Sequence, residues 1–348
     1  MRYKNASKSL RADFVFGAGV SLTIEGRRPV FDHFVAEYYA ASHPRERRTS
    51  DVHIELESPL YRELKMMGGY KTARWRVSLG DTGWEPISAK IALLSTPRSF
   101  GLSLIQGYFV EPLLEMALTR RKAILAPAAG FISGQDATLL VGASRSGKSS
   151  LMVRALGGGV RILGDDQVIL TSEGTVFAFP RRLRVYPDIR ATASSAYSTF
   201  PLSLKSALRG LNIVGSATAG WVAPPLRIQP SALGLEPAKG EHALHRLYLI
   251  ERDERAARPS RSVVEPGALA DQMMALLDRQ RERLTPLLLA KAGWTDLLER
   301  TRERERSILA KALGGIGADK LVVPSCWEAH QAIDHLEQEI GLRINYRL

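Results

Sequence analysis

The stretch Leu139-Leu-Val-Gly-Ala-Ser-Arg-Ser-Gly-Lys-Ser-Ser150 decides how the rest of the chain is interpreted. It contains Gly142, four further residues and then Gly147-Lys148-Ser149, which is the phosphate-binding pattern G-x-x-x-x-G-K-[ST]. The apolar run 138–141 predicts a buried strand before the loop, and the apolar positions within 151–156 predict a helix after it. Strand, glycine-rich loop and helix form the context in which backbone N–H groups bind phosphate.

The loop supplies the predicted nucleotide-binding residues. Lys148 is expected to bring a cation to the β- and γ-phosphates, and the Ser149 hydroxyl is expected to bind Mg²⁺. ATP and Mg²⁺ are therefore the expected cofactors, and a plain glycine-rich turn is the alternative. The predicted nucleotide-binding residues are Gly142, Ala143, Ser144, Arg145, Ser146, Gly147, Lys148, Ser149 and Ser150.

Two acidic residues follow the loop at a short distance. The apolar run 160–163 predicts a strand that leads into Gly164-Asp165-Asp166, and Asp165 lies seventeen residues beyond Lys148. A phosphotransferase needs a carboxylate near the phosphates, as a general base or as a ligand of the metal. Asp165 is assigned to the metal, and either aspartate could be the base. The alternative is a surface turn, which Gly-Asp-Asp also favours.

A cluster of arginines follows the acidic pair. Arg181, Arg182 and Arg184 could bind an anionic acceptor through charge-assisted hydrogen bonds, or they could form a solvated strand edge. The segment 189–240 is rich in Ser, Ala, Gly and Pro, and it is expected to be a variable loop or lid that contains short helices.

Composition limits the classes of protein that fit. The chain has 348 residues, of which 45% are hydrophobic and 24% charged, as in globular proteins. Cys326 is the single cysteine, which excludes an internal disulfide, and there is neither an apolar run of spanning length nor an apolar signal core. A cytoplasmic protein without membrane contact is expected.

The net charge of +12 favours anionic partners. A basic surface attracts nucleotides, acidic peptides, nucleic acid or anionic lipid. Aromatic residues make up only 7% of the chain, and no nucleic-acid-binding module is visible, so nucleic acid is not expected as a ligand. The clusters could also be solvated arginine-rich faces.

The pattern of the chain predicts two regions. Residues 1–106 form a β-rich N-terminal region, and residues 107–348 form the P-loop domain. Within these regions we expect a helix over 107–122, a single strand over 123–132 and a hairpin turn at Gly134-Gln-Asp136 that leads into the loop. Other expected strands and helices are a strand over 13–24, a helix over 29–41, strands over 51–57, 74–79, 87–94, 167–170, 175–179, 244–251 and 320–323, and helices within 264–313 and over 327–340.

Three motifs together resemble the HPr kinase/phosphorylase superfamily, and within it the smaller HPr-kinase-like proteins often found beside peptide-modification genes. They are Gly142-Ala-Ser-Arg-Ser-Gly-Lys-Ser149, Ile162-Leu-Gly-Asp-Asp166 and Phe179-Pro-Arg-Arg-Leu183. The resemblance covers residues 107–340. It implies an α/β fold similar to the nucleotide-binding core of phosphoenolpyruvate carboxykinase, a P-loop that holds ATP with Mg²⁺, and an aspartate that serves as base.

The chain departs from this family at three places. Arg145 replaces the glycine that usually stands in the middle of the loop, Ala126-Pro-Ala-Ala129 lacks the histidine often found before the loop, and no Glu-x-Arg-Gly segment follows. An arginine tolerates a left-handed backbone poorly, so the loop is expected either to have another shape or to direct Arg145 at a phosphate.

These observations lead to a main hypothesis with two alternatives. The chain is expected to be an ATP-dependent kinase that phosphorylates a hydroxyl of a peptide, protein or small molecule, with Lys148, Asp165 and Asp166 as catalytic residues. A catalytically weak nucleotide-binding module that acts as an assembly or maturation partner is the first alternative. An NTPase that acts on nucleic acid is the second, and a homo-oligomer is compatible with each.

Overall fold

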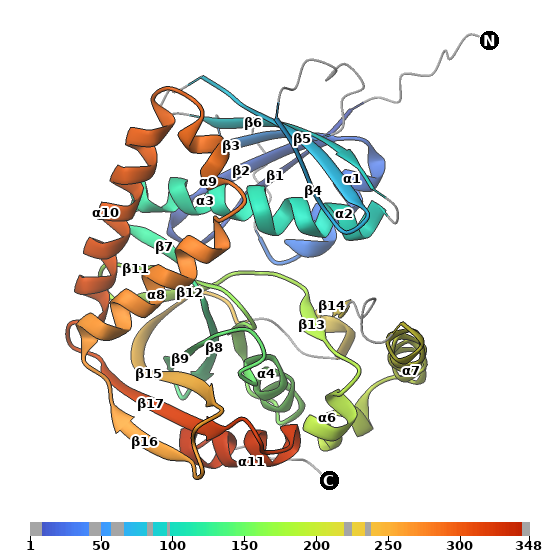
Figure 1. The fold of residues 1–348 in the computed structure, drawn as a ribbon, viewed down its shortest axis with the longest axis vertical. Coiled ribbons are helices and arrows are strands. Elements are labelled where there is room, and N and C mark those ends of the chain that lie inside the picture. Colours follow the sequence, from blue (N-terminus) through green and yellow to red (C-terminus); the bar gives the residue numbers. More distant parts are fainter. Residues whose placement is uncertain are drawn as a thin grey trace. The chain divides into compact units, whose positions relative to one another are not determined.

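The computed structural model describes residues 9–41, 50–56, 66–81, 86–95, 98–218, 225–233 and 238–342. It is a mixed α/β structure (Figure 1) that divides into two compact units. The first unit comprises residues 1–124 and 274–308, and the second comprises residues 125–273 and 309–348. Among the described residues, no helix combines the length and the apolar character needed to cross a bilayer.

The first unit contains a six-stranded mixed sheet with the strand order β1-β2-β3-β6-β5-β4. The strand β3 pairs in parallel with both of its neighbours, whereas the other neighbouring strands are antiparallel. The strands are β1 (Leu10–Val15), β2 (Ser21–Gly26), β3 (Val52–Leu56), β4 (Met66–Tyr70), β5 (Ala73–Leu79) and β6 (Ile87–Leu94). The strand expected over 13–24, with a bend or bulge at Gly17 and Gly19, is instead a hairpin, because the chain reverses completely at the 3₁₀ turn Gly17–Gly19.

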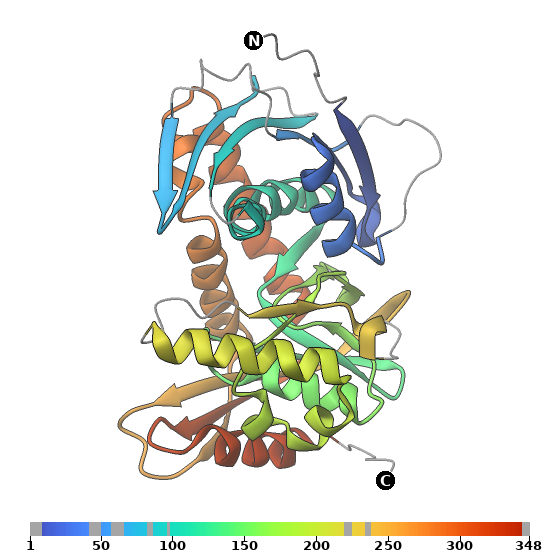
Figure 2. The same ribbon diagram turned by 90° about the vertical axis from the view of Figure 1, so that its right-hand side faces the viewer.

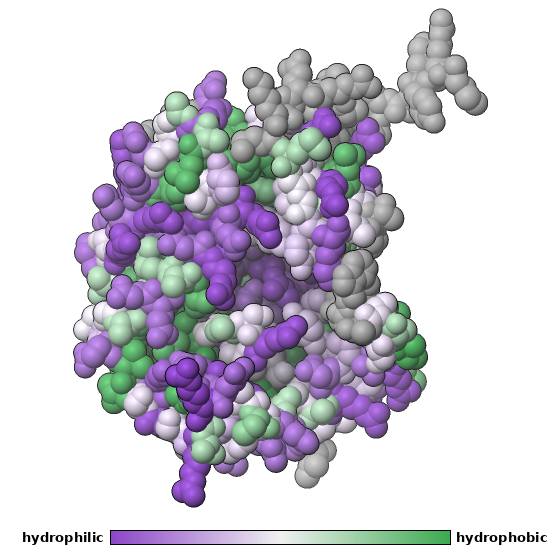
Figure 3. Space-filling view, viewed as in Figure 1, coloured by the Kyte–Doolittle hydropathy of each residue, from purple (hydrophilic) through white to green (hydrophobic). Residues whose placement is uncertain are grey.

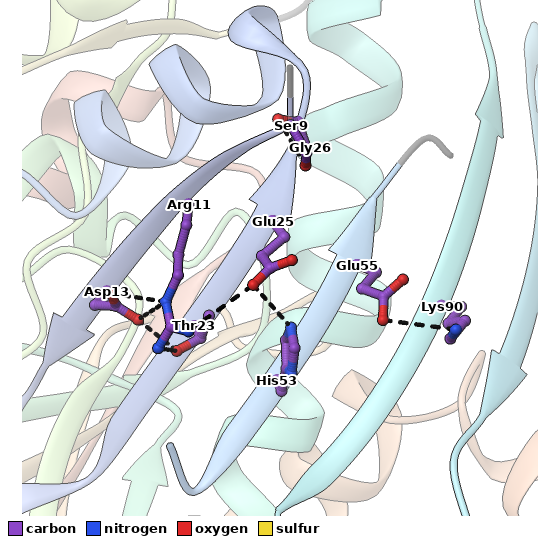
Figure 4. A network of polar contacts seen from close by, with 9 residues as sticks. All are labelled: Ser9, Arg11, Asp13, Thr23, Glu25, Gly26, His53, Glu55 and Lys90. Carbon is purple, nitrogen blue, oxygen red and sulfur yellow. Dashed lines mark hydrogen bonds and ion pairs between the residues drawn. The ribbon is translucent and has the colours of Figure 1, made fainter. Parts of the chain in front are cut away.

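Alternation along the strands separates an apolar face of this sheet from a polar face. The helices α1 (Arg28–Glu37), α2 (Arg98–Ile105) and α3 (Glu111–Leu118) pack against the sheet. On the polar face, Glu25 lies 3.9 Å from Arg11 and 3.6 Å from His53 (Figure 4). This face carries cross-strand polar contacts, and the same figure also shows the ion pair of Glu55 with Lys90.

The compact units differ from the two regions expected from the sequence, which met between residues 106 and 107. The helix α3 lies beyond that point, yet it packs on β3 of the first unit. The distant segment 274–308 also belongs to this unit: Lys291 Nζ donates to the carbonyls of Leu79 (2.6 Å) and Gly80 (2.5 Å), and the Trp294 indole donates to Gly80 (3.2 Å). Contacts between segments that are distant along the chain therefore determine the boundary.

Two long helices connect the second unit to residues 274–308 of the first unit. It leaves the second unit along α8 (Pro266–Gln280) and returns along α10 (Trp294–Leu313), with α9 (Thr285–Leu289) between them. The strongly helical segment expected over 264–313 is thus confirmed as helical.

A nine-stranded sheet belongs to the second unit except for the first two residues of β7; its strand order is β10-β8-β9-β15-β12-β11-β7, and β17 pairs with both β15 and β16. The strand β9, which leads into the glycine-rich loop, is antiparallel to β8 and parallel to β15. The strands are β7 (Ala123–Ala126), β8 (Ala128–Ser133), β9 (Asp136–Gly142), β10 (Ile162–Gly164), β11 (Val168–Thr171), β12 (Thr175–Ala178), β15 (Glu241–Asp253), β16 (Ser260–Val263) and β17 (Gly317–Pro324).

The expected strand over 123–132 is wrong as a single element. It is divided at Pro127, which has no N–H to donate to a neighbouring strand. The part before Pro127, β7, lies beside β11, and the part after it, β8, lies between β10 and β9. The hairpin turn expected at Gly134-Gln-Asp136 is confirmed, because Ser133 and Asp136 pair at the end of the β8–β9 hairpin.

Helices and a small two-stranded sheet complete the second unit. The helix α4 (Lys148–Gly157) packs against β8 and β10 and also contacts α6 and α11. Figure 2 shows α7 side-on, and its sixteen residues make it longer than the short helices expected in this segment. The remaining elements are α5 (Ile189–Thr192), α6 (Ser194–Thr199), α7 (Leu202–Ala217), α11 (Ala329–Ile340), β13 (Leu183–Val185) and β14 (Leu226–Ile228).

Candidate phosphate-binding site

The strand and the helix predicted on either side of the glycine-rich loop are both present. The strand β9 ends at Gly142 and α4 begins at Lys148. A β-carbon on Gly142 would lie 2.5 Å from the Ile250 carbonyl oxygen, so a larger residue would collide with the neighbouring strand. Gly147 has φ +105°, and its β-carbon would lie 2.6 Å from Ile333. Steric contacts therefore explain why both positions of the pattern are occupied by glycine.

Arg145 occupies a left-handed backbone conformation with φ 69°. The loop therefore keeps, at Arg145, the left-handed backbone that glycine adopts most readily. Its side chain is exposed. A non-glycine residue in this region costs about 1–2 kcal/mol, so the loop stores strain at Arg145.

Lys148 is buried within the loop. Its ammonium group donates to the carbonyls of Gly142 (2.7 Å) and Ala143 (2.9 Å) and to the Ser146 hydroxyl (3.2 Å). Burial lowers the pKa of Lys148, while the charges of Asp166 and Asp165 oppose that shift. The Lys148 ammonium thus lies against the backbone of the loop. Ser149 and Ser150 follow in the first turn of α4.

The aspartates between β10 and β11 differ in their surroundings. Asp165 is buried and accepts a hydrogen bond from the Arg184 N–H (3.1 Å). Burial and the adjacent Asp166 charge raise the pKa of Asp165. The Asp166 side chain is 38% exposed and forms ion pairs with Arg184 (3.0 Å) and Arg181 (3.9 Å). Burial raises the pKa of Asp166, but the charges of Arg184, Arg181 and Lys148 outweigh burial and lower it overall.

The structure brings most of the predicted site residues into one electrostatic cluster. Lys148, Asp165 and Asp166 influence one another's pKa, and Arg181 and Arg184 both pair with Asp166. Arg182 is half-buried immediately before β13. Sequence reasoning missed Gln167, whose side-chain carbonyl accepts from Arg181 at 2.9 Å. Its signal would have been a polar residue at the start of an apolar strand.

Sequence reasoning also missed Arg154. This residue lies on α4, where its Nε donates to the Thr192 carbonyl and its guanidinium pairs with Asp334 (2.7 Å) and Glu337 (2.7 Å) of α11. Because Ile333 of α11 also lies against Gly147, α11 supports both the loop and the helix that follows it. The signal in the sequence would have been a single arginine among the apolar residues 151–156.

The loop and the acidic pair contain oxygen groups of the kind that Mg²⁺ binds. Among the described residues, no three His, Cys, Asp or Glu side chains are grouped so that they could hold a metal ion. Magnesium bound to phosphates needs only one or two protein oxygens, and the Ser149 hydroxyl and the Asp165 carboxylate are groups of this type.

The chain matches no protein-family model, and no curated protein matches it significantly.

Proposed function

We propose that the second unit is an ATP-dependent kinase that phosphorylates a hydroxyl of a peptide, protein or small molecule. Its P-loop core would be of the HPr kinase/phosphorylase and phosphoenolpyruvate carboxykinase type. The observation that carries the proposal is the buried Lys148 ammonium at the start of α4, which donates to the carbonyls of Gly142 and Ala143, together with the pair Asp165 and Asp166 directly after β10. A loop cation and a pair of carboxylates are the groups that phosphoryl transfer requires.

The residues would divide the work as follows. The backbone N–H groups of the loop and Lys148 would bind the phosphates, and Ser149 and Asp165 would hold Mg²⁺. Bound ATP would supply the phosphoryl group, while Mg²⁺ would neutralise charge on its phosphates. Asp166 is the better placed base, because it is half-exposed and its arginine partners keep it ionised.

The proposed transfer needs no reactant besides ATP and the acceptor hydroxyl. The acceptor oxygen forms a bond to the γ-phosphorus, and the bond from that phosphorus to the bridging oxygen breaks, so that the diphosphate leaves. The hydroxyl proton passes to Asp166. Arg181 and Arg184 would orient the acceptor and hold the carboxylate of Asp166 in place.

Transfer of labelled phosphate from ATP to hydroxyl-bearing peptides and proteins tests the proposal. Asp166→Asn should reduce the rate by about 10² or more, since the amide keeps the shape of the carboxylate but cannot take the proton. Nucleotide affinity should remain, and the exposed Asp271→Asn should behave as wild type. Wild-type rates in both Asp165→Asn and Asp166→Asn would contradict the assignment.

The second candidate is a nucleotide-binding module that acts as an assembly or maturation partner without catalysis. The observation that favours it is that both aspartates already have partners, the Arg184 N–H for Asp165 and two guanidinium groups for Asp166. Tight calorimetric binding of ATP with neither hydrolysis nor transfer would support this candidate over the kinase.

A further inference from the structure

The segment between Glu173 and Glu236 has an unusual charge balance. It contains seven basic residues and a single acid, Asp188, so it carries +6 of the chain's net charge of +12. The basic residues are Arg181, Arg182, Arg184, Arg190, Lys205, Arg209 and Arg227. The elements from β13 to β14 hold five of these basic residues together with Asp188, so they carry +4, and α7 is the longest of these elements.

The helix α7 is attached to the second unit along one side only. Leu208 is buried and Leu204 packs at the edge of the same apolar core. The opposite side exposes Leu202, Ser206, Arg209 and Ile213, whose spacing of four, three and four residues puts them on one helical stripe. Leu202 is 81% exposed and Ile213 is 69% exposed.

Apolar and polar groups are mixed along this stripe. Figure 3 shows green and purple side chains next to each other over α7. Gly210 adjoins Arg209, and no described atom lies within 4 Å of the position of its missing β-carbon. Glycine weakens a helix interior, and Gly210 also leaves the helix surface low beside the arginine. Lys205 on the flank donates to the Ser198 carbonyl (2.7 Å) and lies over the Tyr197 ring.

We propose that this stripe of α7 is a docking surface for an acidic amphipathic segment of a partner protein. Apolar side chains of the segment would cover Leu202 and Ile213, and a carboxylate would pair with Arg209 between them. An amphipathic helix that lies on such a face would make contacts of this kind at intervals of three and four residues. The surface is defined by its own residues, so it does not depend on phosphoryl transfer.

Charge and pattern favour this occupant over two others. A second copy of α7 offers no partner for Arg209, because the helix contains no acidic residue. A membrane-surface helix needs a continuous apolar face, whereas Ser206, Arg209 and Gly210 lie between the exposed apolar side chains of α7. An acidic segment with apolar residues complements both features.

Selection from a random display library of sixteen-residue peptides on the full chain tests the proposal without a known partner. Counter-selection uses the variant Arg209→Glu with Ile213→Ser. Enriched peptides should combine acidic and apolar residues, and their affinity should fall at least about tenfold in that variant, as expected when a central contact of an interface is removed. The matched control, Arg306→Glu with Val263→Ser, changes an exposed arginine and an exposed valine elsewhere and should bind as wild type.

Several results would overturn the proposal. These are no enrichment relative to the counter-selected variant, enriched peptides without acidic residues, and equal binding by wild type and the variant. Binding to vesicles that contain phosphatidylglycerol, lost in the Arg209→Glu, Ile213→Ser variant and without peptide enrichment, would assign the surface to a membrane instead. Dimerisation that this variant abolishes would assign it to a second copy. Circular dichroism of each variant confirms that α7 and the core remain folded.

Discussion

At the scale of single residues, Lys148 is the centre of the candidate site. Its ammonium group is buried, is held by two carbonyls and a hydroxyl, and lies in the field of two aspartates. These contacts keep the charge at the inner side of a loop whose glycines are required by steric contact. The side chain is therefore held at one position in the loop.

Lys148→Ala should weaken ATP binding at least about tenfold, since a charge-assisted hydrogen bond contributes about 1.5–3 kcal/mol. Titration calorimetry with ATP and Mg²⁺ measures the change. The exposed Lys311→Ala serves as control and should retain wild-type affinity. Equal affinity in Lys148→Ala and wild type would remove the basis for the phosphate site.

Arg145 provides a second test at this scale. Arg145→Gly should raise the free energy of unfolding by about 0.5–1 kcal/mol, because relief of the left-handed strain exceeds the added entropy of the unfolded chain. Urea denaturation measures the effect. Ser144→Gly is the matched control; Ser144 has no positive φ, so the glycine should lower stability. A loss of stability in both variants would mean that Arg145 is not strained.

At the scale of elements, the helices α4 and α11 are joined next to the loop. Arg154 of α4 pairs with Asp334 and Glu337 of α11, and Ile333 of α11 lies against Gly147. The side chain of Glu337 is 20% exposed and that of Asp334 is 55% exposed, so water screens the Arg154–Glu337 pair less than the Arg154–Asp334 pair. The helix that carries the loop thus depends on a helix near the C-terminal end of the chain.

Arg154→Met should destabilise the protein by about 1–3 kcal/mol, less than for a fully buried pair because Asp334 is exposed. Glu337→Gln should cost more than Asp334→Asn, since the Glu337 pair is the better shielded one. Thermal and urea denaturation of the three variants give this order. The reverse order would show that solvent shielding does not rank the two pairs, and no loss in Arg154→Met would show that apolar contacts alone join the two helices.

At the scale of the whole chain, an ionic cluster joins distant segments within the first unit. Arg281 donates to both carboxylate oxygens of Glu305, at 2.8 Å and 2.5 Å, and Glu115 of α3 is buried beside them. Burial and the charge of Glu305 raise the pKa of Glu115 well above its usual value. The protonation of Glu115 therefore depends on residues more than a hundred positions away along the chain.

This equilibrium predicts a pH dependence of stability. The folded state holds a proton on Glu115 more tightly than the unfolded chain, so stability should fall as the pH rises from the unfolded pKa towards the raised folded pKa. The slope of this contribution is about 1.4 kcal/mol per pH unit. Glu115→Gln should flatten the profile by that amount in urea denaturation on the alkaline side of the ordinary glutamate pKa.

The half-exposed Glu55→Gln is the control for this profile and should leave its slope unchanged. Parallel profiles for Glu115→Gln and wild type would show that Glu115 is ionised in the folded state.

The sequence alone determined the local features of this protein. The strand before the loop, the helix after it and the turn at Gly134 follow from residue spacing and backbone sterics, and the strand predicted over 87–94 has those bounds in the structure. Such features depend on neighbours along the chain, whose influence is already present in the pattern.

The tertiary structure alone decided the rest. Hydrophobic spacing did not show that Pro127 sends β7 and β8 to different neighbours, or that α2 begins at Arg98, before the expected helix start at residue 107. Nor did it assign 274–308 to the first unit, or give Arg154 and Glu115 their distant partners. Burial, pairing and pKa depend on groups brought together by packing, and local patterns do not encode which distant surfaces will meet.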